Sequence, residues 1–111
     1  MTLRSRALLD LVHEMNTCLV EIPNVCQGYS PDGLEPAHAN WAMHGRGMGH
    51  KADDVFAASC RACHAALDGS TRLPREDRIF YWHRGAVRTW AFLMQHGWLH
   101  ISHQRTVNGR R

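Results

Sequence analysis

The chain has 111 residues, with 13 basic and 10 acidic side chains, nine histidines and a formal net charge of +3. This length predicts one domain with a modest core, for which a bound metal ion is a common aid to stability. No run of 18 apolar residues occurs, and the N-terminus does not match a signal peptide, so we expect no membrane partner. We therefore expect a cytoplasmic protein in a reducing compartment, where cysteines bind metal more often than they form disulfides.

The charge is unevenly distributed along the chain. Residues 1–71 carry five basic and eight acidic side chains, whereas residues 72–111 carry eight basic and two acidic ones. Twelve of the 13 basic residues are arginines, which can bind phosphate in a bidentate manner. The C-terminal third is therefore predicted to meet a polyanion such as DNA, with a solvated helix face as the simpler alternative.

The first predicted element is an amphipathic helix over residues 3–15, where apolar side chains recur at helical spacing. Residues 17–26 combine an apolar run that favours extended structure with a Pro-Asn turn signal. They are predicted to form an irregular hairpin that brings Cys18 and Cys26 together. Residues 27–36 have the composition of a loop.

Two helices are predicted in the second half of the chain. The Gly-rich residues 42–54 are predicted to be a loop, and a short Ala-rich helix follows. The longest helix is predicted from apolar residues that recur at steps of three and four between residues 79 and 94. Ser70 or Thr71 is expected to cap its start, and Gly97 to follow its end.

The four cysteines form two pairs, Cys18/Cys26 and Cys60/Cys63. The C-x2-C spacing of the second pair is typical of a zinc knuckle, and two pairs supply the four thiolates of a tetrahedral site. A disulfide and buried free thiols are the alternatives, and the lack of a secretory signal favours zinc. The predicted zinc ion is structural and would join the hairpin to the start of the Ala-rich helix.

A second candidate site consists of His38, His64 and Asp68. Because His64 and Asp68 are four residues apart on a predicted helix, they should project side by side. His38 precedes the Gly-rich loop. A histidine is more often a packed or surface residue than a catalyst, so a hydrogen-bonded cluster without chemistry is the alternative for these three residues.

The chain resembles the HNH nucleases of the ββα-metal superfold and, more narrowly, the YbcO-like nuclease family of phages and prophages. The resemblance covers residues 17 to about 100. It rests on the stretches CLVEIPNVC (18–26), AHAN (37–40), GRGMGHKADD (45–54), CRACH (60–64) and LDGS (67–70). It implies an α+β fold: a small zinc-braced ββα core with an N-terminal helix and a long C-terminal helix. All of this would form a single domain over residues 1–111, with a basic tail at 104–111.

The resemblance also implies a metal-dependent endonuclease that hydrolyses DNA in phage or prophage DNA processing or recombination, in the bacterial host's cytoplasm. His38 would be the general base, and Asp54 would orient it or add a metal ligand. His64 and Asp68 would hold a catalytic Mg²⁺, Mn²⁺ or Zn²⁺ ion. Phosphate contacts are expected from Arg46, Lys51, Arg75, Arg78, Arg84 and Arg88.

One departure from the HNH pattern leaves other functions open. Many HNH enzymes carry an aspartate directly before the first histidine, where this chain has Ala37. A non-catalytic, zinc-stabilised module that binds DNA or protein is therefore the alternative function. A third hypothesis is a protein-interaction patch of exposed tryptophans, formed by Trp41, Trp82, Trp90 and Trp98. A homodimer is compatible with the sequence.

Overall fold

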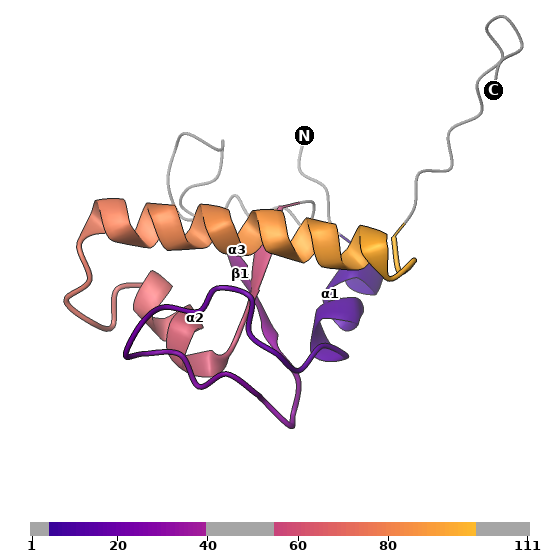
Figure 1. Ribbon diagram of the computed structural model, residues 1–111, viewed down its shortest axis with the longest axis horizontal. Helices are drawn as coiled ribbons and strands as arrows, with labels where there is room; N and C mark the ends of the chain where they lie inside the picture. Colours follow the sequence, from indigo (N-terminus) through magenta and orange to yellow (C-terminus); the bar gives the residue numbers. More distant parts are fainter. Residues whose placement is uncertain (1–4, 40–54, 100–111) are drawn as a thin grey trace, which may run out of the picture.

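The computed structural model describes residues 5–39 and 55–99. These ranges contain helices α1 (Arg6–His13), α2 (Arg61–Leu67) and α3 (Arg75–Gln95), and strands β1 (Glu35–His38) and β2 (Phe56–Ser59). The order β1-β2-α2 is the predicted ββα unit, flanked by α1 and the long α3 (Figure 1). The predicted α+β class is confirmed. No helix in these two ranges combines the length and the hydropathy that a bilayer-spanning segment requires.

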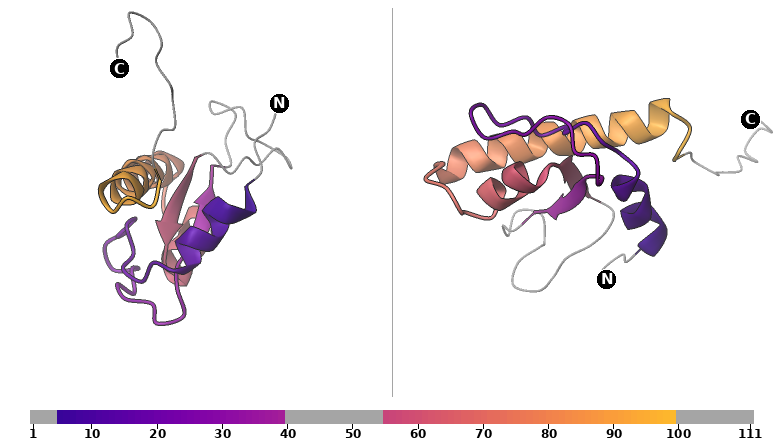
Figure 2. Two further views of the ribbon diagram at one scale, coloured as in Figure 1. Left: turned by 90° about the vertical axis from the view of Figure 1, so that its right-hand side faces the viewer. Right: turned by 90° about the horizontal axis from the view of Figure 1, so that it is seen from below.

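The two strands form an antiparallel hairpin in the centre of the molecule. Their register pairs Glu35 with Ser59 and His38 with Phe56. All four residues of β2 are buried. Helix α3 packs along β2, whereas α1 and α2 contact β1. The strands consequently lie between α3 on one side and α1 on the other (Figure 2, left).

Helix α3 approaches β2 closely at Gly85. A Cβ atom added to Gly85 would lie 2.7 Å from Val20 Cγ2 and 3.1 Å from the Ala57 Cβ atom. The small side chains of β2 and the missing side chain of Gly85 therefore set the distance between helix and strand. Trp82 of α3 is also buried, and its indole N–H donates to the Ala37 carbonyl at 2.8 Å.

Thr89, one turn after Gly85, connects α3 to the backbone of β2. Its hydroxyl accepts a hydrogen bond from the Ala58 N–H at 2.8 Å and donates to the Gly85 carbonyl at 2.7 Å. The Ala58 carbonyl accepts from the Leu19 N–H at 3.1 Å. Thr89 is fully buried, and these contacts satisfy its hydroxyl, as burial of a polar group requires.

The stretch of residues 17–30 is an irregular loop, and the extended structure predicted within it is wrong. A single bridge pairs Thr17 with Tyr29. Val20 and Ile22 are buried in the core, but Glu21 has a positive φ of 54°. That conformation interrupts any strand, because a strand needs negative φ at every residue. Apolar side chains here fill the core without forming a ladder.

The ends of α3 agree with the prediction at one terminus only. Gly97 follows the helix with a φ of 70°, as expected for a residue beyond a C-cap. At the start, Pro74 is the N-cap and no side chain caps the helix, so the cap predicted at Ser70 or Thr71 is wrong. Thr71 instead accepts a hydrogen bond from the Leu73 N–H at 3.3 Å. The residue before a proline is disfavoured in helical conformation, which delays the helix until after Pro74.

Candidate active site and metal centre

The four cysteines meet where the loop of residues 17–30 contacts the start of α2. One Sγ atom from each lies within 4.8 Å of the other three, and all four are free thiols. Sulfur ligands about 2.3 Å from a tetrahedral zinc ion are about 3.8 Å apart, so this set fits zinc. The predicted convergence of Cys18 and Cys26 with Cys60 and Cys63 is confirmed, and the cluster could hold a metal ion such as zinc.

Backbone N–H groups point at the sulfur atoms of this cluster. Cys60 is the N-cap of α2, and its Sγ accepts from the Cys63 N–H at 3.4 Å. The Cys18 Sγ accepts from the Cys60 N–H at 3.3 Å, and the Cys26 Sγ accepts from the Gly28 N–H at 3.2 Å. Such donors favour the thiolate, which is the form that binds a metal ion.

The thiols affect one another strongly when no metal ion is bound. The hydrogen bond from Cys63 is the main reason that the pKa of Cys18 falls to about 4. The same hydrogen bond, together with burial, raises the pKa of Cys63. Burial raises the pKa of Cys26 to about 11. The metal-free cluster thus holds a thiolate at Cys18, and protons must leave Cys26 and Cys63 before these two sulfur atoms can bind zinc.

His64 lies in α2 and Asp68 is the C-cap residue directly after it, and the two side chains are adjacent, as their spacing predicts. His64 Nε2 is 3.6 Å from Asp68 Oδ2. A nitrogen and an oxygen that each lie about 2.1 Å from one divalent ion are about 3.0–3.5 Å apart. The observed separation is slightly longer than this range, so one side chain must rotate slightly before both atoms can bind one ion. The other ring nitrogen, His64 Nδ1, lies 2.8 Å from Glu35 Oε1 in β1.

Glu35 is a residue of this site that the sequence analysis missed. Its second carboxylate oxygen, Oε2, accepts from Arg61 Nε at 3.1 Å. Partial burial acts to raise the pKa of Glu35, but the hydrogen bonds from His64 and Arg61 outweigh it and lower the pKa. The composition of residues 27–36 predicts a loop at Glu35, whereas β1 begins there. Its place two residues before Ala37, on the same strand face, is the signal that could have found it.

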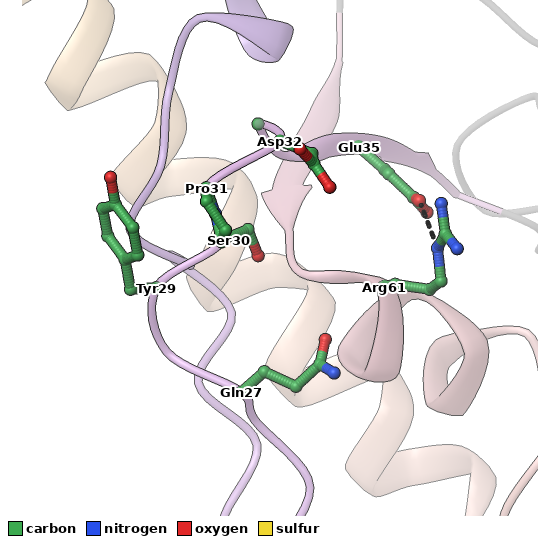
Figure 3. A pocket seen from close by; sticks show the side chains of 8 residues that line it. Gln27, Tyr29, Ser30, Pro31, Asp32, Glu35 and Arg61 are labelled. Atoms are coloured by element: carbon green, nitrogen blue, oxygen red, sulfur yellow. Dashed lines mark hydrogen bonds and ion pairs between the residues drawn. The ribbon is translucent and has the colours of Figure 1, made fainter.

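A polar cavity of about 250 Å³ adjoins Glu35. Glu35 and Arg61 line one side, and Gln27 with residues 29–33 lines the other (Figure 3). Ser30 and Asp32 bring a hydroxyl and a carboxylate to its wall. The Glu35 carboxylate therefore stands between this cavity and the His64 ring.

His38 lies at the opposite end of β1 from Glu35. Its ring is 6.2 Å from the Phe56 ring, at an interplanar angle of 65°. Side chains alternate between the two faces of a strand, so Glu35 and His38 project to opposite faces, about 10 Å apart along the chain. The structure thus brings Glu35, His64 and Asp68 together. The role of His38 as a general base stays a prediction.

Two of the predicted phosphate-binding arginines contact the loop of residues 17–30. Arg84 Nη2 donates to the carbonyls of Val20 and Glu21, at 2.5 and 2.8 Å. Arg88 Nη1 donates to the Glu21 carboxylate at 2.8 Å. These contacts fasten the loop to α3, and they occupy donors that a phosphate group would use.

Four other basic residues are predicted to contact DNA. Arg75 and Arg78 lie in the first turns of α3. Arg46 and Lys51 lie outside the described residues, and so does Asp54, the residue predicted to orient His38 or to bind the metal ion. The phosphate-binding role of all six basic residues therefore stays a prediction.

Residues 13–98 match the family model described as “Putative nuclease YbcO”. Among solved structures, one described as that of “a putative bacteriophage protein from Escherichia coli str. K-12 substr. MG1655” is similar, with a TM-score of 0.62 and 23% sequence identity. The similarity covers 80% of this chain and 98% of that chain, and at this identity it shows a shared fold. The curated proteins contain no match.

Proposed function

The chain belongs to the family described as “Putative nuclease YbcO”, and on that premise we propose that it is a metal-dependent, HNH-type endonuclease that hydrolyses DNA. The observation that carries the proposal is the family match, because it spans both the cysteine cluster and the α2 site. The ββα order of β1, β2 and α2 supports the HNH type.

In this proposal, His64 and Asp68 hold the catalytic ion. Their ligand atoms are 3.6 Å apart, and the two residues lie in and directly after the helix whose N-cap is Cys60 of the cysteine cluster. A bound divalent ion supplies Lewis-acid stabilisation of the charge that develops on the scissile phosphate. The zinc ion proposed at the four cysteines is structural, because four protein ligands leave no open position.

His38 is the proposed general base. It takes a proton from the attacking water while the water oxygen forms a bond to phosphorus and the bond to the 3′ oxygen breaks. A neutral imidazole suits this step near pH 7. Asp54 is proposed to orient His38 or to complete the metal site.

DNA would be held through its phosphates. Arginines in the C-terminal third, with Arg46 and Lys51, are the proposed contacts. Phosphate contacts give affinity that depends on salt and carries little sequence information. We therefore propose an enzyme with weak sequence preference.

The alternative function is a zinc-stabilised binding module without nuclease activity. The side chain at position 37 favours it, because Ala37 is buried and offers no ligand where many HNH enzymes have an aspartate. In that case Glu35, His64 and Asp68 would form a polar cluster that only stabilises the contact between α2 and β1.

Nicking of supercoiled plasmid DNA tests the two functions. The zinc-loaded protein is assayed with Mg²⁺, Mn²⁺ and Zn²⁺, beside the variants His38→Ala and His64→Ala. His96→Ala is the matched control, since His96 is exposed at the end of α3. Each of the two site variants should lose activity by on the order of 100-fold, while the control keeps it.

Three results are distinguishable in this assay. If His38→Ala nicks DNA like the parent, the base is wrongly assigned. If His64→Ala nicks DNA like the parent, the metal site is wrongly placed. If the folded parent binds DNA but nicks it with none of the ions, the binding module replaces the enzyme.

A further inference from the structure

Glu35 is the described residue that connects the hairpin to the proposed catalytic helix through a histidine. We propose that Glu35 is a positioning residue of the metal site: it fixes the orientation and tautomer of His64, so that Nε2 faces Asp68 and the ion. This inference rests on the proposed function, because it assigns to Glu35 a task within that same site.

The geometry of the carboxylate supports this role. Glu35 Oε1 lies 2.8 Å from His64 Nδ1, and Oε2 accepts from Arg61 at 3.1 Å. Both oxygens are thus engaged, and the contact to His64 is the shorter of the two. The side chain of Glu35 is 30% exposed and that of His64 is 28% exposed, so neither moves freely in solvent.

An ionised carboxylate can only accept hydrogen bonds. His64 must therefore carry its proton on Nδ1 when the pair is formed and the ring is neutral, which leaves the lone pair on Nε2. Nε2 is the atom that lies 3.6 Å from Asp68 Oδ2. Metal-binding histidines commonly donate their second N–H to a carboxylate in this way, which orients the ring and raises its basicity.

The backbone explains why Glu35 can reach His64. Glu35 pairs with Ser59 at the end of β2, and α2 begins two residues later at Arg61. The start of β1 and the first turns of α2 are thus adjacent. Ser59 reinforces the connection, because its hydroxyl donates to the Glu35 carbonyl at 3.3 Å.

The competing explanation is that Glu35 only stabilises the fold through Arg61. The variant Arg61→Ala distinguishes this explanation from the positioning role, because it removes the contact between Glu35 and Arg61 and leaves the contact between Glu35 and His64. Glu35→Ala removes both contacts. Glu35→Gln keeps an oxygen that can accept from Nδ1 but removes the charge.

The experiment uses the zinc-loaded protein and two readouts besides nicking. Nitrogen-15 NMR of the His64 ring reports its tautomer before a second ion is added, and calorimetry with Mn²⁺ reports affinity. The parent should show the Nδ1–H tautomer and bind one Mn²⁺ ion that His64→Ala does not bind. Glu35→Ala should shift the tautomer toward Nε2–H and weaken Mn²⁺ binding about 10- to 100-fold.

The other two variants sharpen this expectation. Glu35→Gln should keep the tautomer and bind Mn²⁺ with an affinity between those of the parent and Glu35→Ala. Arg61→Ala should match the parent in both readouts. If Arg61→Ala weakens Mn²⁺ binding as much as Glu35→Ala does, the role of Glu35 is structural and the inference is overturned.

Failure of the inference and failure of the proposed function give different results. If the parent nicks DNA and Glu35→Ala matches it in tautomer and Mn²⁺ affinity, the inference is wrong and the nuclease stands. If Glu35→Ala changes both readouts as expected but the parent does not nick DNA, the inference holds and the nuclease does not. A parent that binds no Mn²⁺ through His64 overturns the inference.

Discussion

The contact between α3 and β2 at Gly85 leads to a prediction that opposes helix propensity. Alanine is a better helix former than glycine by about 1 kcal/mol, so Gly85→Ala would stabilise a helix whose surroundings left room. The structure leaves none. The new Cβ would lie 2.7 Å from Val20 Cγ2 and 3.1 Å from the Ala57 Cβ atom. Val20 is β-branched and buried, and Ala57 is held in the strand by its pairing with Ala37.

These contacts allow the net change in stability to be worked out. Adding a methyl group to a filled core costs about 1–3 kcal/mol, because neighbouring groups must shift. Subtracting the gain of about 1 kcal/mol in helix propensity leaves a loss of up to about 2 kcal/mol. For a domain of this size, a loss of 1 kcal/mol lowers Tm by roughly 4 °C.

The assay is thermal and urea unfolding of the zinc-loaded protein, followed by far-ultraviolet circular dichroism. Ala91→Gly is the matched control, because Ala91 is exposed on the same helix and tests the propensity term without the core. Ala91→Gly should lose about 1 kcal/mol. If Gly85→Ala unfolds at a higher temperature than the parent while the control unfolds at a lower one, the close approach of α3 to β2 is refuted.

Three further predictions concern the cysteine cluster and Thr89. Cys60→Ala should lower the free energy of unfolding by about 4 kcal/mol or more in the presence of zinc, because metal binding contributes to folding; equal urea midpoints for variant and parent would exclude a structural ion. The pKa values of Cys26 and Cys63 are raised in the metal-free protein, so both thiols carry protons at pH 7 and must release them when zinc binds. Zinc affinity should therefore rise with pH, by about 100-fold per unit near pH 7 for two protons; competition titrations that give the same affinity at pH 6 and pH 8 would disprove this. Thr89→Val should cost about 1–3 kcal/mol, because the Ala58 N–H then has no acceptor, whereas Thr89→Ser should cost less; a valine variant as stable as the parent in urea would contradict the hydrogen bond.

Local patterns predicted the elements whose causes are local. The spacing of apolar residues identified α3, and Gly97 marked its end because a residue without Cβ tolerates positive φ. The spacing of His64 and Asp68 predicts that their side chains are adjacent, and they are, with Asp68 as the C-cap residue of α2. The C-x2-C spacing of Cys60 and Cys63 indicated a metal site, and the structure brings the other two cysteines to it.

What the sequence did not reveal depends on contacts between distant segments. Glu35 and His64 are 29 residues apart, and no local pattern shows that a strand delivers one to the other. Arg84 has the position of a solvent-facing helix residue, yet it donates to carbonyls 63 and 64 residues away. Val20 and Ile22 have strand-forming side chains, but Glu21 between them has a positive φ, which a strand does not allow.

The two backbone groups of Ala58 that face away from β1 are both occupied, the N–H by Thr89 and the carbonyl by Leu19. A two-stranded hairpin would otherwise present an open edge, on which a strand from another molecule could pair and start aggregation. On the β2 side, α3 and the loop of residues 17–30 block that route. A strand from a neighbouring molecule therefore finds no free backbone partner at Ala58.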